Sequence, residues 1–424
     1  MRVLHIIQRY WPIRGGAEIH LGEISARLAE EGHHVTVATS DARDFELFWH
    51  PQSRRFREGE VWHDHVRILR FPVRHLPLSG LTYPGLRRLL WILSNMRWVP
   101  IPVLSRMARF TPWMPDLWRW LDSTEGEFDL VAGMTICFEP LIEAGLRYAH
   151  HHRIPFVIYP LTHLGAASRP GEDELSRFYT MRHQIDLVRQ SDAVVAQTPA
   201  ERDFYIQKGV EPRRIRVVGP GFDPQEVLSG NGERFRERYH LHAPIVFMLT
   251  KMSFDKGVMH TIEAMQRLWD RGYQAHLVLA GDVLDTFQKY YERLSSLLQD
   301  RILLLGTISD EEKRDLLAAG DLLVMPSRTD SFGIVYLEAW AYGKPVIGAR
   351  TWGVMDVIDD QEDGLLVPFG DVSALSQAIA WLISHPEEAK KLGERGRAKA
   401  LTYHTWDRKY WKIRDLYMQL GGDR

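Results

Sequence analysis

Residues 3–38 read VLHIIQRYWPIRGGAEIHLGEISARLAEEGHHVTVA, and this stretch decides the fold. An apolar run of strand length at 3–7 precedes a glycine-containing turn. After that turn, apolar residues recur at helical spacing at Leu21, Ile24 and Leu28. We expect Gly32 to end this helix, because glycine is common just past helix C-termini. A second strand then begins at 35–38. Strand, helix and strand in this order indicate a parallel, doubly wound sheet.

The same alternation continues along the chain. Further strand-like runs of the first half lie at 130–132, 156–158 and 193–196, and those of the second half at 245–249, 276–280, 302–305, 322–325 and 345–348. One helix between them is expected to begin with Thr261 near its N-cap and to end at Arg271. The Pro/Gly-rich stretch 219–224 separates the two halves. The pattern predicts two α/β domains with a hinge, and ligands at the carboxyl ends of both sheets.

Composition supports two domains and excludes several classes of protein. A chain of 424 residues is too long for one ordinary core. It is 45% hydrophobic and 25% charged, as average soluble proteins are, and its net charge of −2 gives no global field to hold nucleic acid. The single cysteine, Cys137, excludes internal disulfides and four-thiolate zinc sites. The start becomes polar too early for a signal peptide and no apolar run is long enough to span a bilayer, so we expect a cytoplasmic protein.

One basic, tryptophan-rich insertion, at about 44–125, interrupts the alternation. Residues 54–120 contain twelve arginines against four acidic residues, and 91–120 contain five of the 14 tryptophans. A helical pattern within it puts five apolar residues on one face, Leu86, Leu89, Leu90, Leu93 and Met96, and puts Arg87, Asn95 and Arg97 off that face. The insertion resembles a peripheral membrane element that meets anionic lipid. The alternative is a helical flap with buried tryptophans and solvated arginines.

Two loops in the sequence suit a phosphate. Gly15 and Gly16 precede the first helix, whose start offers free N–H groups, although an ordinary tight turn has the same pattern. Lys251 and Lys256 follow the strand at 245–249, and two cations in one strand-to-helix loop can converge on a diphosphate. Taken alone, this pair also fits two solvated surface lysines.

The most specific block is PSRTDSFGIVYLEAWAYGKPVI at 326–347. Two carboxylates, Asp330 and Glu338, bracket a Ser-Phe-Gly turn that opens a helix. Pro-Ser, an acid-x7-Glu pair and Ala-x3-Gly-x-Pro-Val together resemble the signature of retaining glycosyltransferases of family 4. Further segments match that family in order, at 15–18, 162–163, 218–223, 251–257, 281–282 and 364–367.

The resemblance implies the GT-B fold, two Rossmann-like doubly wound parallel-sheet domains facing a cleft. The implied domains are 1–218, with the insertion, and 219–400, with a C-terminal helix at 401–424 packing back on the first. It implies a nucleotide-sugar donor held mainly by the second domain and a glycan or lipid-linked acceptor, with no metal or other cofactor. The implied site comprises His163, Asp330, Lys251 and Lys256 as catalytic residues and Gly15, Gly16, Gly281, Ser331, Phe332, Gly333 and Glu338 as donor-binding residues.

Within this implied site, Glu338 binds the ribose and Asp330 the transferred sugar. The two lysines hold the diphosphate, and His163 faces the sugar. Three positions depart from the family pattern: Asp330 and Asp356 stand where Glu is usual, and Lys251 where Arg is usual. A shorter carboxylate and the loss of a bidentate guanidinium predict an altered sugar preference or reduced activity.

Three other functions compete with the transferase. A glycoside hydrolase also uses paired carboxylates, but eight helical residues would separate Asp330 from Glu338 by about 12 Å, beyond the usual ~5 to 9.5 Å of hydrolase pairs. A Rossmann oxidoreductase lacks its Gly-x-Gly-x-x-Gly fingerprint after the first strand. A non-catalytic nucleotide-sugar-binding protein at a membrane surface stays open.

Overall fold

The computed structural model describes residues 1–422, which form two compact units. Within the described residues, the first unit comprises 1–164, 170–219 and 409–422, and the second comprises 165–169 and 220–408. The second segment of the first unit ends at Gly219, one residue from the expected boundary at 218. Two features of this division do not follow from the sequence pattern: the short segment 165–169 belongs to the second unit, and the C-terminal residues return to the first unit only from Lys409.

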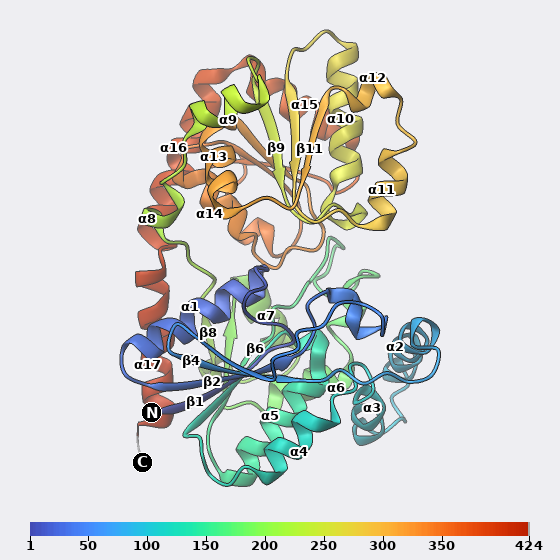
Figure 1. Ribbon diagram of the computed structural model, residues 1–424, viewed down its shortest axis with the longest axis vertical. Helices are drawn as coiled ribbons and strands as arrows, with labels where there is room; N and C mark the ends of the chain where they lie inside the picture. Colours follow the sequence, from blue (N-terminus) through green and yellow to red (C-terminus); the bar gives the residue numbers. More distant parts are fainter. Residues whose placement is uncertain (423–424) are drawn as a thin grey trace. The chain divides into compact units, whose positions relative to one another are not determined.

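The first unit contains an eight-stranded sheet in the order β3-β4-β2-β1-β5-β6-β7-β8 (Figure 1). Its strands are β1 (Arg2–Ile6), β2 (His34–Ser40), β3 (Glu60–His63), β4 (Val66–Phe71), β5 (Leu130–Met134), β6 (Phe156–Tyr159), β7 (Ala193–Ala196) and β8 (Ile215–Val217). All neighbouring strands are parallel except β3 and β4, which form an antiparallel pair at one edge. Strands β3 and β4 lie in the insertion, so part of it extends the sheet.

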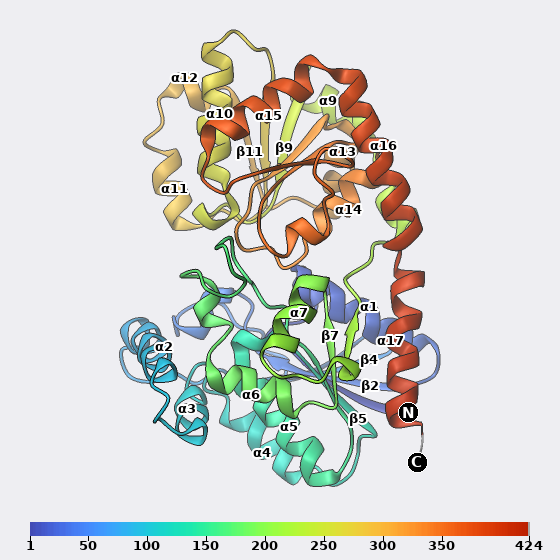
Figure 2. The same cartoon turned by 180° about the vertical axis from the view of Figure 1, so that it is seen from behind.

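The helices of the first unit pack on this sheet or on one another. They are α1 (Gly16–Glu30), α2 (Ser79–Asn95), α3 (Ile101–Ala108), α4 (Pro115–Ser123), α5 (Glu139–His152), α6 (Arg182–Gln190) and α7 (Pro199–Gln207), joined by the C-terminal α17 (Trp406–Gly421). Helices α4, α5 and α6 lie side by side, as Figure 2 shows. The central strands are fully buried, with Leu4, Val131 and Ile158 at 0% exposure, as strands covered on both faces should be.

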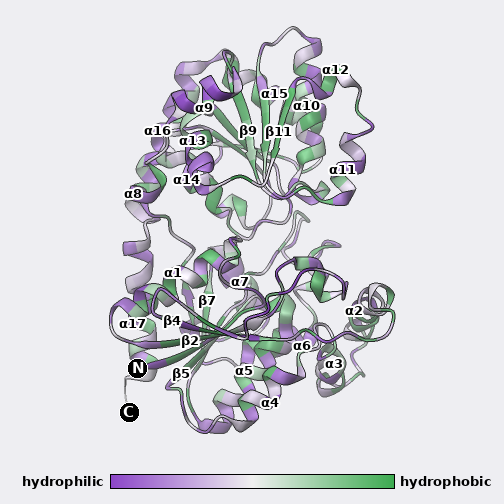
Figure 3. Ribbon diagram, in the orientation of Figure 1, coloured by the Kyte–Doolittle hydropathy of each residue, from purple (hydrophilic) through white to green (hydrophobic). Residues whose placement is uncertain are grey.

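The second unit contains a six-stranded sheet in the order β11-β10-β9-β12-β13-β14, with every neighbouring pair parallel. Its strands are β9 (Ile245–Leu249), β10 (His276–Ala280), β11 (Ile302–Gly306), β12 (Leu322–Met325), β13 (Val346–Ala349) and β14 (Leu365–Val367). Its helices are α8 (Pro224–Val227), α9 (Gly232–Tyr239), α10 (Val258–Asp270), α11 (Asp285–Tyr291), α12 (Ser296–Gln299), α13 (Asp310–Ala319), α14 (Ile334–Ala341), α15 (Val372–Ser384) and α16 (Pro386–Tyr403). Figure 3 shows the strands as hydrophobic segments among helices of mixed character. Both units are thus doubly wound α/β structures, which confirms the predicted fold class.

Two predicted helix features are wrong. Helix α10 begins at Val258, not near Thr261, because Gly257 already caps it in a left-handed conformation with φ +75°. The Thr261 hydroxyl lies inside the helix and donates to the carbonyl of Gly257 at 3.0 Å. The block between the paired carboxylates is also not continuous helix, because α14 begins only at Ile334. The eight-residue helical span used to separate Asp330 from Glu338 is therefore incorrect.

The insertion packs differently from the predicted amphipathic helix. Helix α2 does form, and its buried residues include Leu90 and Arg87. The Arg87 guanidinium donates to the carboxylate of Glu139, which is buried at 1% exposure, so the prediction that Arg87 lies off the packed face is wrong. Leu89 and Met96, expected on the apolar face, are exposed instead. Of the five tryptophans at 91–120, only Trp98 is strongly exposed, at 79%.

The C-terminal helix expected at 401–424 is two helices, with α16 ending at Tyr403 and α17 beginning at Trp406. Tyr417 of α17 is fully buried in the first unit, where its hydroxyl accepts a hydrogen bond from Tyr159 at 3.0 Å and lies 3.2 Å from Nε2 of His5. Burial lowers the pKa of His5 to about 3, so this polar contact holds α17 with a neutral imidazole. Among the described residues, no helix is both long and apolar enough to cross a membrane.

Candidate functional site

The order of strands in the second unit places the candidate site. The order reverses between β9 and β12, and ligands of open α/β sheets bind beyond the carboxyl ends of the strands at such a point. The loops there are joined through their backbones: the amide of Arg328 donates to the carbonyl of Asp255 at 3.0 Å, and that of Met252 to Asp282 at 2.7 Å. The loops after β9, β10 and β12 therefore form one connected rim.

Lys256, predicted to hold the diphosphate, and Asp330, predicted to hold the transferred sugar, contact each other in this rim. The ammonium of Lys256 donates to Oδ1 of Asp330 at 2.5 Å, and their side chains are 21% and 15% exposed. Lys251 is half-buried in the same loop. The structure thus brings Lys256 and Asp330 together, as the sequence predicts for one site, and it shows each neutralising the other.

A second ion pair lies at the helix that follows this loop. Glu338, on α14 and only 8% exposed, accepts a hydrogen bond at Oε1 from the ammonium of Lys313 on α13 at 2.6 Å. Lys313 was not predicted as a site residue, because a lysine in an acidic, amphipathic helix start is usually a solvated surface residue. Only the tertiary packing of α13 beside α14 could identify it. The pair leaves the second oxygen, Oε2, for a further donor.

Glycines let the backbone come close at two of the predicted positions. Gly281 has φ +136°, and a Cβ there would lie 1.9 Å from the carbonyl oxygen of Thr250. Gly333 has φ +87° as the N-cap of α14, and a Cβ there would lie 2.4 Å from the ring of Tyr336. Any larger residue would displace the rim at these points. The glycines therefore serve the loop geometry, and they also leave backbone open to a ligand.

The residues between Asp330 and α14 have distinct roles. Phe332 is 4% exposed and its ring packs 5.6 Å from that of His404, so its side chain belongs to the core. Only the backbone of Phe332 could contact a ligand, together with that of half-buried Ser331. Asp356, the other shortened acid, is exposed at the end of a short 3-10 helix at Val354–Asp356.

An arginine that was not predicted sits beside the lysine loop. Arg328 bonds the carboxylate of Asp255 at 2.6 Å and stacks over the rings of Phe254 and Phe369, 5.7 and 5.1 Å from their centroids. Phe254 is 46% exposed. These contacts fix the orientation of the loop that carries Lys251 and Lys256, because Arg328 is held on both its polar and its flat sides.

In the first unit, His163 follows β6 at the carboxyl edge of the sheet. Its ring stacks on Tyr179 with centroids 4.5 Å apart and 19° between the planes. Buried Glu201 fixes the preceding backbone, because its carboxylate accepts the amide of Thr162 at 2.6 Å and that of Gln197 at 2.7 Å. Burial raises the pKa of Glu201. The sequence did not predict Tyr179 or Glu201 as site residues, since neither lies in a local motif.

The glycine loop of the first unit carries a nearby carboxylate. Gly15 is the N-cap of α1, and Glu18 in the first turn lies so close that a Cβ on Gly15 would be 2.3 Å from its Oε2. Arg9 pairs with the other oxygen of Glu18 at 3.2 Å. An anion approaching Gly15 and Gly16 would therefore meet Glu18 as well as free N–H groups. The predicted phosphate contact here is less favourable than the loop alone suggests.

The described side chains form neither a metal-binding cluster nor a reactive thiol. Within residues 1–422, no group of three or more His, Cys, Asp or Glu residues is placed to hold a metal ion. Burial raises the pKa of Cys137 to about 12, so this thiol is not a nucleophile at neutral pH. The second unit instead offers lysines, carboxylates and open backbone, which suit a charged and hydroxylated ligand.

Comparison with known proteins gives matches along most of the chain. A family described as glycosyl transferases group 1 matches residues 232–399, and one described as a glycosyl transferase 4-like domain matches 15–221. Mannosylfructose-phosphate synthase of Agrobacterium fabrum is 27% identical over 238 residues, which are 53% of this chain and 52% of that protein. The lipopolysaccharide core biosynthesis glycosyltransferase LpsE of Rhizobium meliloti is 28% identical over 59% of this chain and 70% of its own length.

Among solved structures, the Anabaena protein Alr3699/HepE in complex with UDP and glucose superposes with a TM-score of 0.73 at 20% identity, covering 99% of each chain. This likeness concerns the fold alone. The chain spans little more than half the length of the first curated relatives that it matches.

Proposed function

The chain belongs to the group 1 glycosyl transferases, with a glycosyl transferase 4-like first domain, and from this premise we propose that it is a retaining glycosyltransferase. It moves a sugar from a nucleotide-sugar donor, bound by the second unit, to a glycan or lipid-linked acceptor. The observation that carries the proposal is the rim beyond β9 and β12, where Lys256 contacts Asp330 and where Lys313 contacts Glu338. These pairs can serve the two ends of one long donor, its diphosphate and its ribose.

The chemistry follows from the charges in the rim. Cleavage of the sugar–phosphate bond leaves negative charge on the diphosphate, which Lys251 and Lys256 stabilise. Asp330 orients the sugar hydroxyls and Glu338 those of the ribose. The acceptor hydroxyl attacks from the side that the diphosphate leaves, and the diphosphate oxygen takes its proton, so the anomeric configuration is kept. His163 of the first unit is proposed to contact the transferred sugar.

The acceptor is proposed from chemistry and from similarity. LpsE is named for lipopolysaccharide core biosynthesis, and a saccharide carried on lipid is an acceptor of the same class. The insertion retains arginines and apolar side chains at its surface, as a protein working at an anionic membrane would. We therefore propose a lipid-linked acceptor, met at a membrane surface, with a soluble glycan as the alternative.

A panel of nucleotide sugars tests the proposal. The wild-type chain is titrated with UDP-, GDP- and ADP-sugars in thermal unfolding and calorimetry, and a specific donor should raise the melting temperature and bind with one-to-one stoichiometry. Failure of every donor would overturn the function. A donor that binds but never releases its nucleotide, with any glycan or lipid-linked acceptor, would instead identify the non-catalytic binding protein.

The arrangement of the carboxylates does not favour a glycoside hydrolase. Asp330 and Glu338 are each paired with a different lysine, Lys256 and Lys313, and not with each other as the acid and base of a hydrolase would be. Hydrolysis of nitrophenyl glycosides in the absence of nucleotide would contradict this conclusion.

A further inference from the structure

We propose that the outer face of α2 and α3 docks on an anionic lipid surface. This α2–α3 face consists of the exposed apolar residues Leu81, Leu89, Ile92, Met96, Trp98 and Val103 and of three arginines, Arg88, Arg97 and Arg106. The proposal deepens the proposed function, on which it rests only for the acceptor, by assigning the surface at which the chain meets lipid. Binding to lipid itself is independent of donor binding.

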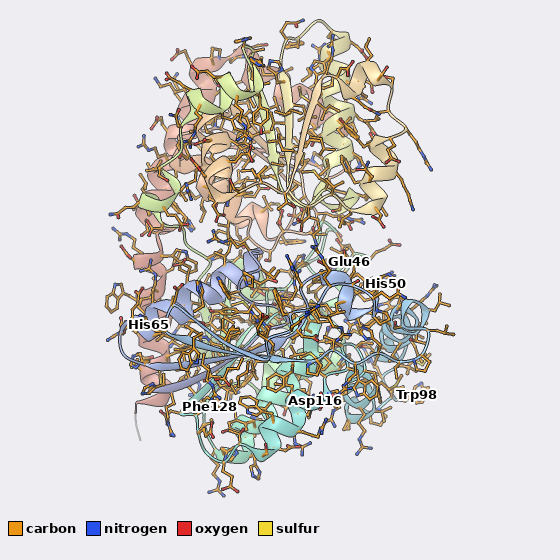
Figure 4. All side chains as sticks on the ribbon, viewed as in Figure 1. Glu46, His50, His65, Trp98, Asp116 and Phe128 are labelled. Carbon is orange, nitrogen blue, oxygen red and sulfur yellow. The ribbon has the colours of Figure 1, made fainter. Side chains whose placement is uncertain are left out.

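Exposed apolar side chains form a stripe on one side of α2 and in the turn that joins it to α3. Leu81, Leu89, Ile92 and Met96 are 74%, 44%, 38% and 36% exposed, and their spacing places them within about 80° of one another around the helix. Trp98 follows at 79% exposure, and Val103 on α3 is 43% exposed. In Figure 4 the labelled Trp98 lies at the outer margin of the first unit, beside these helices.

The side of α2 and α3 opposite the stripe is packed against the rest of the first unit. Five buried residues form its core: Leu90, Val99, Leu104, Ala108 and Met181. Arg87 anchors α2 further by donating to Glu139, whose carboxylate also lies 3.1 Å from Nε2 of buried His183. The helix is therefore fixed with its apolar stripe outward. Six exposed large apolar side chains on α2, α3 and the turn between them exceed the isolated apolar residues of an ordinary surface.

The charge of the face favours an anionic partner. No acidic residue occurs between Asp64 and Asp116. Other arginines of this stretch are paired with carboxylates, as Arg74 is with Asp116, Arg87 with Glu139 and Arg109 with Glu143. Among the described residues, no carboxylate pairs with the arginines of the face, which are left to the solvent side.

This combination fits a lipid surface better than a folded partner. Leucine, isoleucine and tryptophan side chains can enter the boundary between headgroups and acyl chains, while the long arginine side chains reach the phosphates above them. Trp98 is suited to the headgroup level because its ring is apolar and its indole N–H can donate. Binding of this kind is reversible, and salt weakens its electrostatic part.

Sedimentation with vesicles tests the inference on the full chain. Phosphatidylcholine vesicles, with and without phosphatidylglycerol, are compared at low and high salt. We expect the wild-type chain to pellet with the anionic vesicles at low salt, less at high salt, and little with the neutral vesicles. Charge reversal of the face, R88E/R97E/R106E, should lower the partition coefficient on anionic vesicles at least tenfold.

Matched controls come from the same unit. The triple variant R213E/R214E/R216E makes the same charge change at three exposed arginines outside the face and should bind vesicles like the wild type. Trp98→Ala should weaken binding, whereas Trp62→Ala, which removes another exposed tryptophan at 65%, should not. Calorimetric donor affinity should be the same in all four variants.

Several outcomes would overturn the inference. One is equal pelleting of the two triple variants, which would show a response to net charge alone. Another is no pelleting of the wild type under any condition. A wild-type dimer that Trp98→Ala dissociates, without vesicle binding, would assign the face to a second copy of the chain. If the wild-type chain binds no donor, the proposed function is overturned, but binding to vesicles would still support the docking of the α2–α3 face on lipid.

Discussion

Replacing Glu338 by Gln is expected to weaken donor binding while leaving the second unit folded. The substitution keeps the size of a side chain that is 8% exposed, but it removes the negative charge and one acceptor. In the wild type, Oε1 is held by Lys313 at 2.6 Å, and Oε2 is the atom that we propose accepts from the ribose. The amide of Gln has a single oxygen, so if Lys313 keeps that oxygen the ribose faces an NH2 group, and the charge-assisted contact to the ribose is lost.

The size of the effect follows from that one lost contact. A hydrogen bond to a charged group contributes about 1.5–3 kcal/mol, so the donor Kd should rise about ten- to hundredfold. Stability should change little, by about 1 kcal/mol or less, because the Lys313 side chain is 30% exposed and its pairing is screened by water. Calorimetry with the donor measures the first quantity, and denaturant unfolding measures the second.

A matched variant separates the ribose contact from general loss of charge. Glu312 on α13 is a carboxylate of the same unit that pairs with Arg238 at 3.4 Å, and Glu312→Gln should leave the donor Kd unchanged. Lys313→Met should weaken binding less than Glu338→Gln, since it frees Oε1 but loses the positioning of the carboxylate. Equal donor affinity in Glu338→Gln and the wild type would refute the assignment of Glu338 to the donor.

Four further outcomes are expected. Asp330→Asn should release Lys256, so that calorimetry finds the nucleoside diphosphate bound about two- to fivefold more tightly while sugar transfer slows; weaker binding would contradict the pairing of the two groups. Transfer should survive excess EDTA, and a complete loss that magnesium or manganese restores would show that a metal carries the charge. Proton NMR of the product should show the anomeric configuration of the donor, and inversion would exclude retention. Burial lowers the pKa of Lys409 to about 8 from 10.5, so the folded chain binds fewer protons between these values and its stability rises with pH across that window; Lys409→Met should raise the melting temperature at neutral pH and flatten that rise.

The strands were predictable because parallel sheets buried on both faces leave continuous apolar runs in the sequence. The runs at 245–249 and 276–280 coincide with β9 and β10 to the residue. Helix starts were less predictable, since Gly257 caps α10 through a left-handed conformation that no side-chain signal marks. The short strands β3 and β4 were missed because they lie at the edge of the sheet within a basic insertion.

The site was predictable where residues are close in sequence and hidden where tertiary packing supplies them. The motif at 326–347 gave Asp330 and Glu338. It could not give Lys313, which reaches Glu338 from a preceding helix, or the ion pair of Asp330 with Lys256 across two loops. The error at Arg87 has the same origin: helical periodicity places a charged residue on the polar face, while the buried carboxylate of Glu139 draws it inward.

Residues 165–169 lie in the second unit although the chain on either side of them lies in the first. Trp352 holds them, because its indole Nε1 donates to the carbonyl of Ala167 at 2.9 Å and its amide donates to that of Gly165 at 3.1 Å. With the crossings at 219 and 408, the polypeptide passes between the units four times. The second unit is thus not one contiguous segment of the chain. A recombination that exchanged residues 220–408 between relatives would separate Trp352 from its own acceptor carbonyls, so a functional chimera should carry 165–169 with it.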